Sequence, residues 1–336
     1  MVSSASPNRA PPDAGPLLRT EALTKDYGRV RALDRVSFGV RPGEAFGLLG
    51  PNGSGKTTAL RLVMGFLQPS AGRAAIAGHD CWHDSVNARR HVAYLPGELR
   101  LYENMTGRQL VRFLCDLRGQ HVNAELDDLA RVFDIDLRRP IANMSSGMKR
   151  KVALLTVFAP HAPLLIMDEP TNTLDPTMRD QLLAQVRRAR ERGQSVLFSS
   201  HVLAEAEQVC DRVAILRRGQ LAHVQKMSEL MEGRLVRARF QGEAVAPPPL
   251  PGLRVLEQTK DRLTLEFTGE LPELLSWLAR QPLVELRVEP LGLTPVYYRY
   301  HGGEGADLPA GAADRWGEGQ PTTAITEPNH DVRPGA

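Results

Sequence analysis

The most constraining feature of this sequence is a glycine-rich loop that stands between a buried strand and a helix. The segment EAFGLLG is a short apolar run that ends at Gly50, and TTALRLVMGFL follows the loop with helical spacing. Between them lies GPNGSGKTT, which fits the pattern G-x-x-x-x-G-K-[ST]. A strand, a phosphate-binding turn and a helix in this order predict an α/β fold with a phosphate site at the helix start.

Each part of this loop has a physical task. The glycines let the backbone curl so that its amides face a phosphate chain, and the helix dipole adds to the attraction. We expect Lys56 to place a positive charge on the β- and γ-phosphate oxygens and the Thr57 hydroxyl to ligate Mg²⁺. The predicted phosphate-binding residues are Gly50, Pro51, Asn52, Gly53, Ser54, Gly55, Lys56, Thr57 and Thr58.

Polar side chains also end the next buried strands. LLIMDEP places Asp168 and Glu169 at a strand end, where adjacent side chains point to opposite sides and therefore serve different tasks. We predict that Asp168 binds Mg²⁺, and that Glu169 polarises the water that attacks the γ-phosphate. His201 ends SVLFSSH and is predicted to hydrogen-bond the γ-phosphate. Tyr27 is predicted, on weaker grounds, to stack on adenine; the plain alternative is an exposed strand tyrosine.

The rest of the chain supports a two-part organisation. Strands alternate with helices across residues 17–232, which predicts a largely parallel sheet with helices on its faces. A mainly helical insertion begins near residue 98, where Leu110, Phe113, Leu114 and Leu117 recur at helical spacing and are expected to be core. Residues 233–301 are predicted to form a small α+β domain. The alternation of apolar and polar residues in it predicts that Val284, Leu286 and Val288 point inward. Low-complexity composition predicts a disordered leader at 1–16 and a disordered tail at 302–336.

Composition excludes several classes. With 42% hydrophobic residues and a net charge of +3, the 336-residue chain can bury a core and shows no preference for nucleic acid. No uninterrupted apolar run approaches the roughly 18 residues of a membrane helix. The three cysteines are far apart and lack metal-ligand spacing, so we expect reduced, structural thiols in a cytosolic protein.

A second segment also has the features of an anion site. IANMSSGMKRKVALL joins small hydroxyl residues, a glycine and a helix start to three basic residues, Lys149, Arg150 and Lys151. One chain would then carry two phosphate sites.

In their order, Tyr27, the loop at 50–58, SSGMKRK, LLIMDEPTNTLD and SSH resemble the nucleotide-binding subunit of ATP-binding cassette (ABC) transporters, over about residues 17–230. The resemblance implies a P-loop NTPase cassette: a RecA-like core with a mixed sheet, an antiparallel β subdomain, and a helical subdomain at about 98–150. It implies MgATP hydrolysis, with ATP and Mg²⁺ bound.

The resemblance also explains the second anion site. In this family the signature, usually L-S-G-G-Q, caps the γ-phosphate of ATP held by the opposite subunit, which implies a head-to-tail homodimer with composite sites. Ser145 and Gly147 match its serine and second glycine, and Ser146 stands in place of the first glycine. Asp175 matches the aspartate that crosses the interface. Gly97 stands where many members have glutamine, and we hypothesise that the adjacent Glu98 partly replaces it.

The segments YLPGELRLYENMTG and SSGMKRK resemble the corresponding segments of ATPases that serve bacterial ABC-2-type exporters, including drug and antibiotic exporters. This implies a separate polytopic permease that docks on the helical insertion, a location at the cytoplasmic face of the membrane, and no nucleic-acid partner. Three alternatives stay open: a soluble ABC ATPase acting on nucleic acid or the ribosome, an importer subunit, and a poorly hydrolysing regulator. The short insertion and single cassette argue against the first, and the intact Glu169 and His201 against the last.

Overall fold

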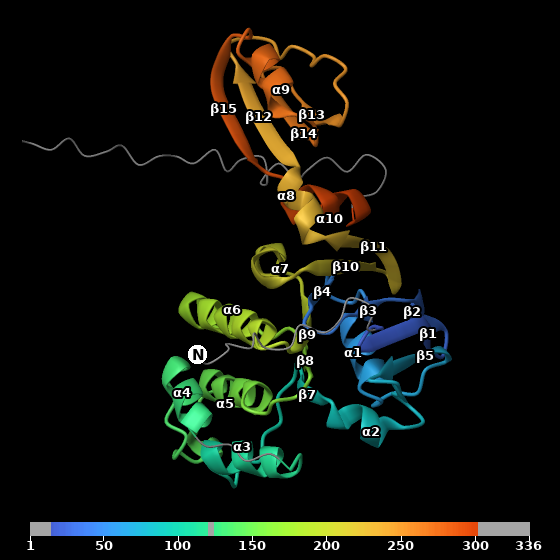
Figure 1. Cartoon of the computed structure of the whole chain (residues 1–336), viewed down its shortest axis with the longest axis vertical. Helices are drawn as coiled ribbons and strands as arrows, with labels where there is room; N and C mark the ends of the chain where they lie inside the picture. Colours follow the sequence, from blue (N-terminus) through green and yellow to red (C-terminus); the bar gives the residue numbers. More distant parts are fainter. Residues whose placement is uncertain (1–14, 120–123, 302–336) are drawn as a thin grey trace, which may run out of the picture.

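The computed structural model describes residues 15–119 and 124–301 (Figure 1). Nearly all of the predicted leader and the whole predicted tail lie outside these residues. In the part of the chain that is described, no helix is long and apolar enough to cross a membrane.

A six-stranded sheet forms the centre of the larger part of the molecule. Its order is β11–β10–β4–β9–β8–β7, and every neighbouring pair is parallel except β10 with β11. The strands are β4 (Ala45–Leu49), β7 (Val92–Leu95), β8 (Leu164–Met167), β9 (Ser195–Ser200), β10 (Arg212–Arg217) and β11 (Gln220–Lys226). The predicted largely parallel sheet is therefore present.

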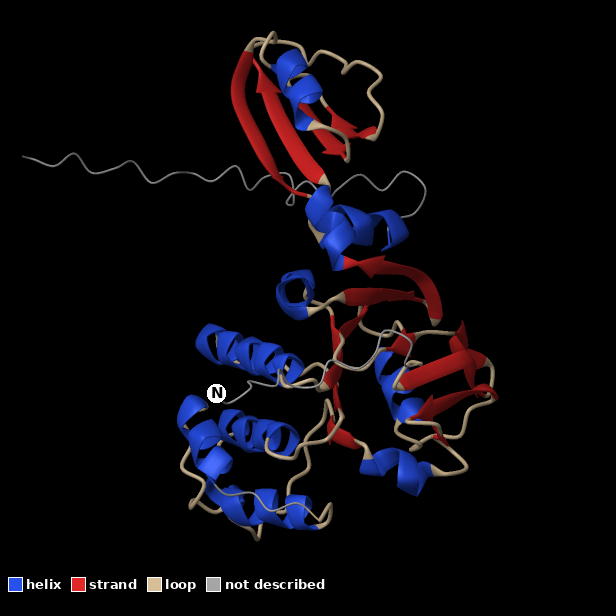
Figure 2. Ribbon diagram, viewed as in Figure 1, coloured by secondary structure: helices blue, strands red, loops and turns tan. Residues whose placement is uncertain are grey.

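Both faces of this sheet are covered. Successive side chains of a strand point to opposite faces, and here they enter two different hydrophobic cores. In β8, Leu165 and Met167 enter one core, whereas Leu164 and Ile166 enter the other. Figure 2 shows one group of helices on one face, and further helical segments with a second sheet on the opposite face. The first group includes α5 (Ser146–Phe158), α6 (Pro176–Glu191) and α7 (Leu203–Val209); the opposite face carries α1 (Lys56–Val63), and α2 (Ser85–Arg90) lies below it.

The second sheet is antiparallel and packs on α1. Its order is β2–β1–β5–β6, with β3 paired to β1. Its strands are β1 (Leu18–Tyr27), β2 (Val30–Val36), β3 (Gly39–Val40), β5 (Ala71–Ile76) and β6 (His79–Asp80). Leu18 and Ile76 of this sheet share a core with Leu60 of α1, so the sheet supports the helix that follows the phosphate loop.

The helical part contains α3 (Gly107–Asp116) and α4 (Ala124–Val132), followed by a 3-10 turn at Ile141–Asn143 and by α5. Thr106 starts α3 through a capping box: its hydroxyl accepts from the Gln109 backbone amide, and the Gln109 side chain accepts from the amide of Thr106. Leu110 is buried and Leu114 packs on the same core. Phe113 and Leu117, which were expected to be core as well, are exposed.

The last part of the described chain adds an antiparallel sheet of order β13–β14–β12–β15 with one helix, α9, on it (Figure 1). The elements are α8 (Met227–Glu232), β12 (Arg234–Phe240), β13 (Leu253–Gln258), β14 (Arg262–Phe267), α9 (Leu271–Leu278), β15 (Leu283–Pro290) and α10 (Leu293–His301). Leu274 and Leu278 of α9 cover β12 and β14 in a separate core, whereas Leu293 and Val296 of α10 join the main core.

The edge strand β15 differs from its predicted burial. Leu286 pairs with Ala238 and Val288 with Val236, so both lie on the sheet face that α9 covers. Yet Val284, Leu286 and Val288 are all exposed, because the core under α9 is formed by side chains of β12 and β14. Alternation predicted the face of Leu286 and Val288 correctly, and the prediction that all three side chains are buried is wrong.

Candidate functional site

Three central strands bring the predicted site residues to one edge of the sheet. β4, β9 and β8 are parallel neighbours, and their registers pair Leu49 with Ser200 and Met167 with Phe198. The carboxyl ends of parallel strands meet at the same edge, so the phosphate loop after β4 lies beside the residues that follow β8 and β9. The segments GPNGSGKTT, DEP and SSH, far apart in sequence, therefore meet in space.

The phosphate loop, residues 50–58, requires glycine at two positions for steric reasons. A Cβ at Gly50 would lie 2.5 Å from both the Leu216 carbonyl oxygen and Ser54 Oγ. Gly55 has a φ of 105°, and its Cβ would lie 2.7 Å from the Ala32 carbonyl oxygen. Gly55 is also the N-cap residue of α1, so the loop presents a helix N-terminus to an anion that binds there.

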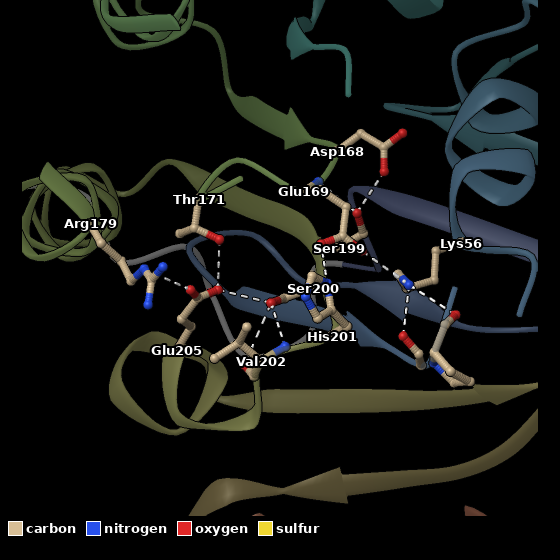
Figure 3. A network of polar contacts seen from close by, with 12 residues as sticks. Lys56, Asp168, Glu169, Thr171, Arg179, Ser199, Ser200, His201, Val202 and Glu205 are labelled. Atoms are coloured by element: carbon tan, nitrogen blue, oxygen red, sulfur yellow. Dashed lines mark hydrogen bonds and ion pairs between the residues drawn. The ribbon is translucent and has the colours of Figure 1, made fainter. Parts of the chain in front are cut away.

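Lys56 is held inside this loop. Its ammonium donates to the carbonyl oxygen of Gly50 at 2.7 Å and to that of Pro51 at 3.2 Å. The same Nζ lies 3.1 Å from Glu169 Oε1, and the side chain is only 5% exposed. The lysine charge is therefore neutralised by a carboxylate that follows β8, two strands away from β4 in the sheet (Figure 3).

Glu169 joins the three strands. Its Oε2 lies 2.8 Å from His201 Nδ1, while its Oε1 pairs with Lys56. Its backbone amide donates to Ser199 Oγ at 2.9 Å. Its φ of 46° is left-handed, which a residue with a side chain adopts rarely and at a cost in conformational energy. The structure therefore brings Glu169 into direct contact with Lys56 and with His201, the other two predicted catalytic residues.

Asp168 has a different environment from Glu169, in keeping with their opposite directions along the strand. Its Oδ1 accepts a 2.7 Å hydrogen bond from Ser199 Oγ, and the side chain is buried. A Cβ at Gly97 would lie 3.3 Å from the other oxygen, Oδ2, so a side chain at position 97 would crowd that oxygen. Mg²⁺ prefers oxygen ligands and keeps several waters, and a carboxylate oxygen of Asp168 together with the Thr57 hydroxyl is a donor set of that kind.

The described residues contain no cluster of three or more histidine, cysteine or acidic side chains that would hold a metal without other ligands. A magnesium ion here would therefore need phosphate oxygens and water as well, which is how this ion usually binds. The chemistry of the site fits a metal that arrives with its nucleotide.

Tyr27 lies at the end of β1, in the same hairpin as Ala32, which touches Gly55. It is 47% exposed, and Lys25 Nζ lies 5.2 Å from the centre of its ring. The ring is accessible for stacking, and no described contact places it against the loop.

The signature segment, residues 144–148, begins α5. The Ser145 hydroxyl accepts from the Met148 amide at 3.3 Å and so caps the helix. Ser145 and Ser146 are exposed, and a Cβ at Gly147 would meet no atom within 4 Å. Asp175 is likewise exposed and caps α6 through a 2.9 Å bond from the Met178 amide. Among the contacts described, none joins these residues to the phosphate loop of the same chain.

The basic residues after the signature do not face its helix N-terminus. Lys149 forms a 2.6 Å ion pair with Glu103, and Lys151 donates to the Asp134 carbonyl oxygen at 3.3 Å. Arg150 points into the protein instead. The helix N-terminus, rather than these side chains, is what the segment offers to an anion.

Sequence reasoning missed a buried acid behind the site. Glu205 of α7 is 2% exposed, and its Oε2 accepts from Thr171 Oγ1 at 2.9 Å and from Ser200 Oγ at 2.8 Å. Its Oε1 lies 3.3 Å from Arg179 Nε. Figure 3 shows this network directly beside the Lys56, Glu169 and His201 contacts. The available signal was an acidic residue in the first turn of a helix one step after SSH.

Comparison with known proteins agrees with this geometry. The model of the ABC transporter family matches residues 33–172. The linearmycin resistance ATP-binding protein LnrL of Bacillus subtilis is 30% identical over 219 residues, which cover 64% of this chain and 70% of that protein. This chain belongs to the ABC transporter ATP-binding family. It carries an ABC ATPase domain of the predicted P-loop cassette fold.

This ABC protein is also similar to a second curated relative and to solved structures of ABC cassettes. It is 34% identical to the probable multidrug ABC transporter ATP-binding protein YbhF of Escherichia coli over 210 residues, which are 61% of this chain and 36% of that one. The ABC chain thus spans about a third of YbhF. A solved ATP-binding subunit of an ABC transporter superposes with a TM-score of 0.60 at 32% identity, covering 64% of this chain and 91% of that one. The cassette MJ0796, solved as a dimer, shares the fold with a TM-score of 0.58 at 20% identity, over 62% and 98% of the two chains.

Proposed function

We propose that this chain binds and hydrolyses MgATP and thereby powers export through a separate ABC-2-type membrane permease. The observation that carries the proposal is the position of Glu169, whose carboxylate contacts Lys56 of the phosphate loop and His201 of the next strand. A base, a phosphate-binding cation and a hydrogen-bonding histidine thus meet at a helix N-terminus.

ATP binding to this edge requires Lys56 to change partners. The triphosphate carries more negative charge than the Glu169 carboxylate, so we expect the ammonium to move from Glu169 and the loop carbonyls to the β- and γ-phosphate oxygens. The backbone amides at the start of α1 provide further donors. Tyr27, exposed on its hairpin, is the proposed stacking partner of adenine.

The release of Lys56 frees Glu169 for catalysis. Its carboxylate then accepts a hydrogen bond from a water molecule and receives the proton as the water oxygen attacks the γ-phosphorus. The bond between the γ-phosphorus and its bridging oxygen breaks, which gives ADP and inorganic phosphate. His201, held 2.8 Å from the same carboxylate, is placed to orient the γ-phosphate and the carboxylate together.

Two side chains would hold the magnesium ion. The Thr57 hydroxyl and Oδ2 of Asp168 are its proposed protein ligands, and Ser199 fixes the direction of the Asp168 carboxylate. When bound, the ion neutralises charge that develops on the β- and γ-phosphate oxygens.

The exposed signature supports a homodimer. Ser145, Ser146 and Gly147 present a helix N-terminus to solvent, and Asp175 lies exposed at the start of α6. We propose that two copies associate head to tail, so that each ATP lies between the phosphate loop of one copy and the signature of the other. The dimeric arrangement of MJ0796, which shares the cassette fold, supports this proposal.

The helical part offers a surface for the proposed permease. Phe113 of α3 and Leu117, which directly follows that helix, are exposed, the latter to 69%, and Tyr102 contacts Phe113 edge to face. Exposed apolar side chains that lie together are common at protein interfaces. A permease segment that docks here would hold the protein at the cytoplasmic face of the membrane. The printed names of LnrL and YbhF support drug or antibiotic export, while the transported molecule would be selected by the permease.

Three experiments test the proposal. The purified chain should hydrolyse ATP only with Mg²⁺ present, and Glu169→Gln should accumulate as an ATP-stabilised dimer in gel filtration. Failure of this variant to dimerise with ATP would contradict the composite site. Co-purification from detergent-solubilised membranes should bring down a polytopic protein, whereas recovery with ribosomes or nucleic acid alone would support the soluble alternative.

A further inference from the structure

The guanidinium of Arg150 is enclosed by backbone carbonyl groups from two loops. It donates to the carbonyl oxygens of Pro96 at 3.3 Å and Gly97 at 3.2 Å, and to those of Glu169 at 2.5 Å and Pro170 at 3.3 Å. The first two residues follow β7 and the last two follow β8. One side chain of α5 therefore ties together the ends of two strands of the central sheet.

Burying a charged guanidinium in this way costs solvation free energy. Arg150 is 3% exposed, and no ion pair to a carboxylate is formed by it within the described residues. Burial lowers the pKa of the guanidinium, while the nearby charges of Asp168 and Glu169 oppose that effect. A buried charge must be satisfied by hydrogen bonds, and here carbonyl dipoles alone provide them. Lys149 and Lys151, its neighbours in sequence, reach exposed partners instead.

One of these carbonyls belongs to the strained residue of the site. Glu169 holds a left-handed backbone, with φ of 46°, and persists in it only because its surroundings impose it. Ser199 fixes the amide on one side of the residue, and Arg150 fixes the carbonyl on the other. The direction of the Glu169 side chain is set by this backbone.

We propose that Arg150 is a positioning residue, which locks the backbone of Glu169 and of the Gly97 loop onto the signature helix of the same chain. This inference rests on the proposed function. Arg150 lies four residues, about one helical turn, beyond Ser146. The helix that reaches the partner's ATP with its N-terminus thus holds its own chain's Glu169 one turn later, and this contact links the two composite sites.

The test compares Arg150→Met with Arg150→Lys and with the control Lys151→Met. Arg150→Met keeps an unbranched side chain but removes every donor, so we expect kcat for ATP hydrolysis to fall at least tenfold with KM changed less than about threefold. Arg150→Lys retains a single cationic donor group and should recover part of kcat. Lys151→Met, on the exposed side of the same turn, should match the wild type. Equal kcat in Arg150→Met and wild type would overturn the proposal.

A second readout separates positioning from a purely structural role. If Arg150 acts through Glu169, Arg150→Met binds ATP but hydrolyses it slowly, and it should accumulate as an ATP-stabilised dimer like Glu169→Gln. A monomeric Arg150→Met that still binds a fluorescent ATP analogue would contradict the inference. Should Arg150→Met fail to fold, as judged by circular dichroism, Arg150→Lys and Arg150→Gln carry the same comparison. Loss of hydrolysis in the wild type itself would instead contradict the proposed function.

Discussion

The ammonium of Lys56 lies 3.1 Å from the carboxylate of Glu169, so the proposed phosphate-binding cation is paired with the proposed catalytic base. Both side chains are largely buried, and each would be costly to leave unpaired. Each partner of the pair therefore compensates the buried charge of the other. Under the proposed mechanism, a triphosphate that replaces the carboxylate at Lys56 would also release the proposed base, which would couple substrate binding to activation.

The first prediction follows from this pairing. Glu169→Gln removes the competitor for Lys56 and a negative charge next to the triphosphate, so ATP should bind several-fold more tightly. Hydrolysis should fall about 10²- to 10⁴-fold, the usual contribution of a general base. Equilibrium titration with a fluorescent ATP analogue and a phosphate-release assay measure the two effects. Glu103→Gln, which breaks an exposed ion pair with Lys149, is the matched control and should change neither. Weaker ATP binding by Glu169→Gln would contradict the competition.

A second prediction concerns the glycine beside Asp168. In Gly97→Ala the added methyl group would lie 3.3 Å from Asp168 Oδ2, tight enough to crowd this oxygen but not to prevent folding. We expect the Mg²⁺ concentration that gives half-maximal ATPase activity to rise by roughly threefold to tenfold, since one proposed ligand becomes less accessible. Nucleotide binding measured in EDTA is the internal control and should stay unchanged. An unaltered Mg²⁺ dependence would remove Asp168 Oδ2 from the proposed ligand set.

Local motifs made most of the site predictable. The glycine loop and the two polar strand ends are contiguous segments, and parallel strands must bring such ends together, so the meeting of Lys56, Glu169 and His201 follows from sequence. The inward position of Arg150 could not be predicted from the sequence. Lys149, Arg150 and Lys151 are chemically alike, and α5 beyond them is buried on nearly all sides, so helical periodicity does not single out the one that turns inward.

The sequence also did not predict how far the side chains of the edge strand β15 are buried. Val284 lies at an irregularity in the pairing of β15 with β12. The alternation of Leu286 and Val288 fixes which face they occupy, since the side-chain period of a strand is two. It carries no information on how far α9 extends across that face. The same limit applies to Phe113 and Leu117, whose helical spacing is shared by core positions and by an interface.

A third prediction tests the buried network behind the site. Glu205→Ala would leave the hydroxyls of Thr171 and Ser200 without their shared acceptor in a buried setting. An unsatisfied buried polar group costs about 1–3 kcal/mol, and we expect a loss of this size in the free energy of unfolding. Urea denaturation with Glu103→Ala as control measures it, because the side chain of Glu103 makes one described contact, an exposed pair with Lys149, and its loss should cost less than about 1 kcal/mol. Equal losses in the two variants would show that the network is not stabilising.

A fourth prediction concerns the cysteines. Burial raises the pKa of the Cys81 thiol to about 12 and that of Cys115 to about 11, and it raises the pKa of Cys210 well above the usual value. At pH 8 all three are therefore neutral thiols, which are poor nucleophiles, and all three are buried. Iodoacetamide should label none of them in the native protein within an hour and all of them in urea, as read by intact mass.

The same pKa shifts fix the sign of a pH effect. Because the folded-state pKa values of Cys81 and Cys115 lie above those of unfolded thiols, the folded protein retains these protons when the unfolded chain loses them. Their contribution to stability is complete below about pH 9 and is lost as the pH rises toward 11 and 12. Replacing both residues with serine should flatten the fall of the unfolding free energy between pH 9 and 11, measured in urea at each pH. An unchanged slope in the double variant would assign the alkaline loss of stability to other groups.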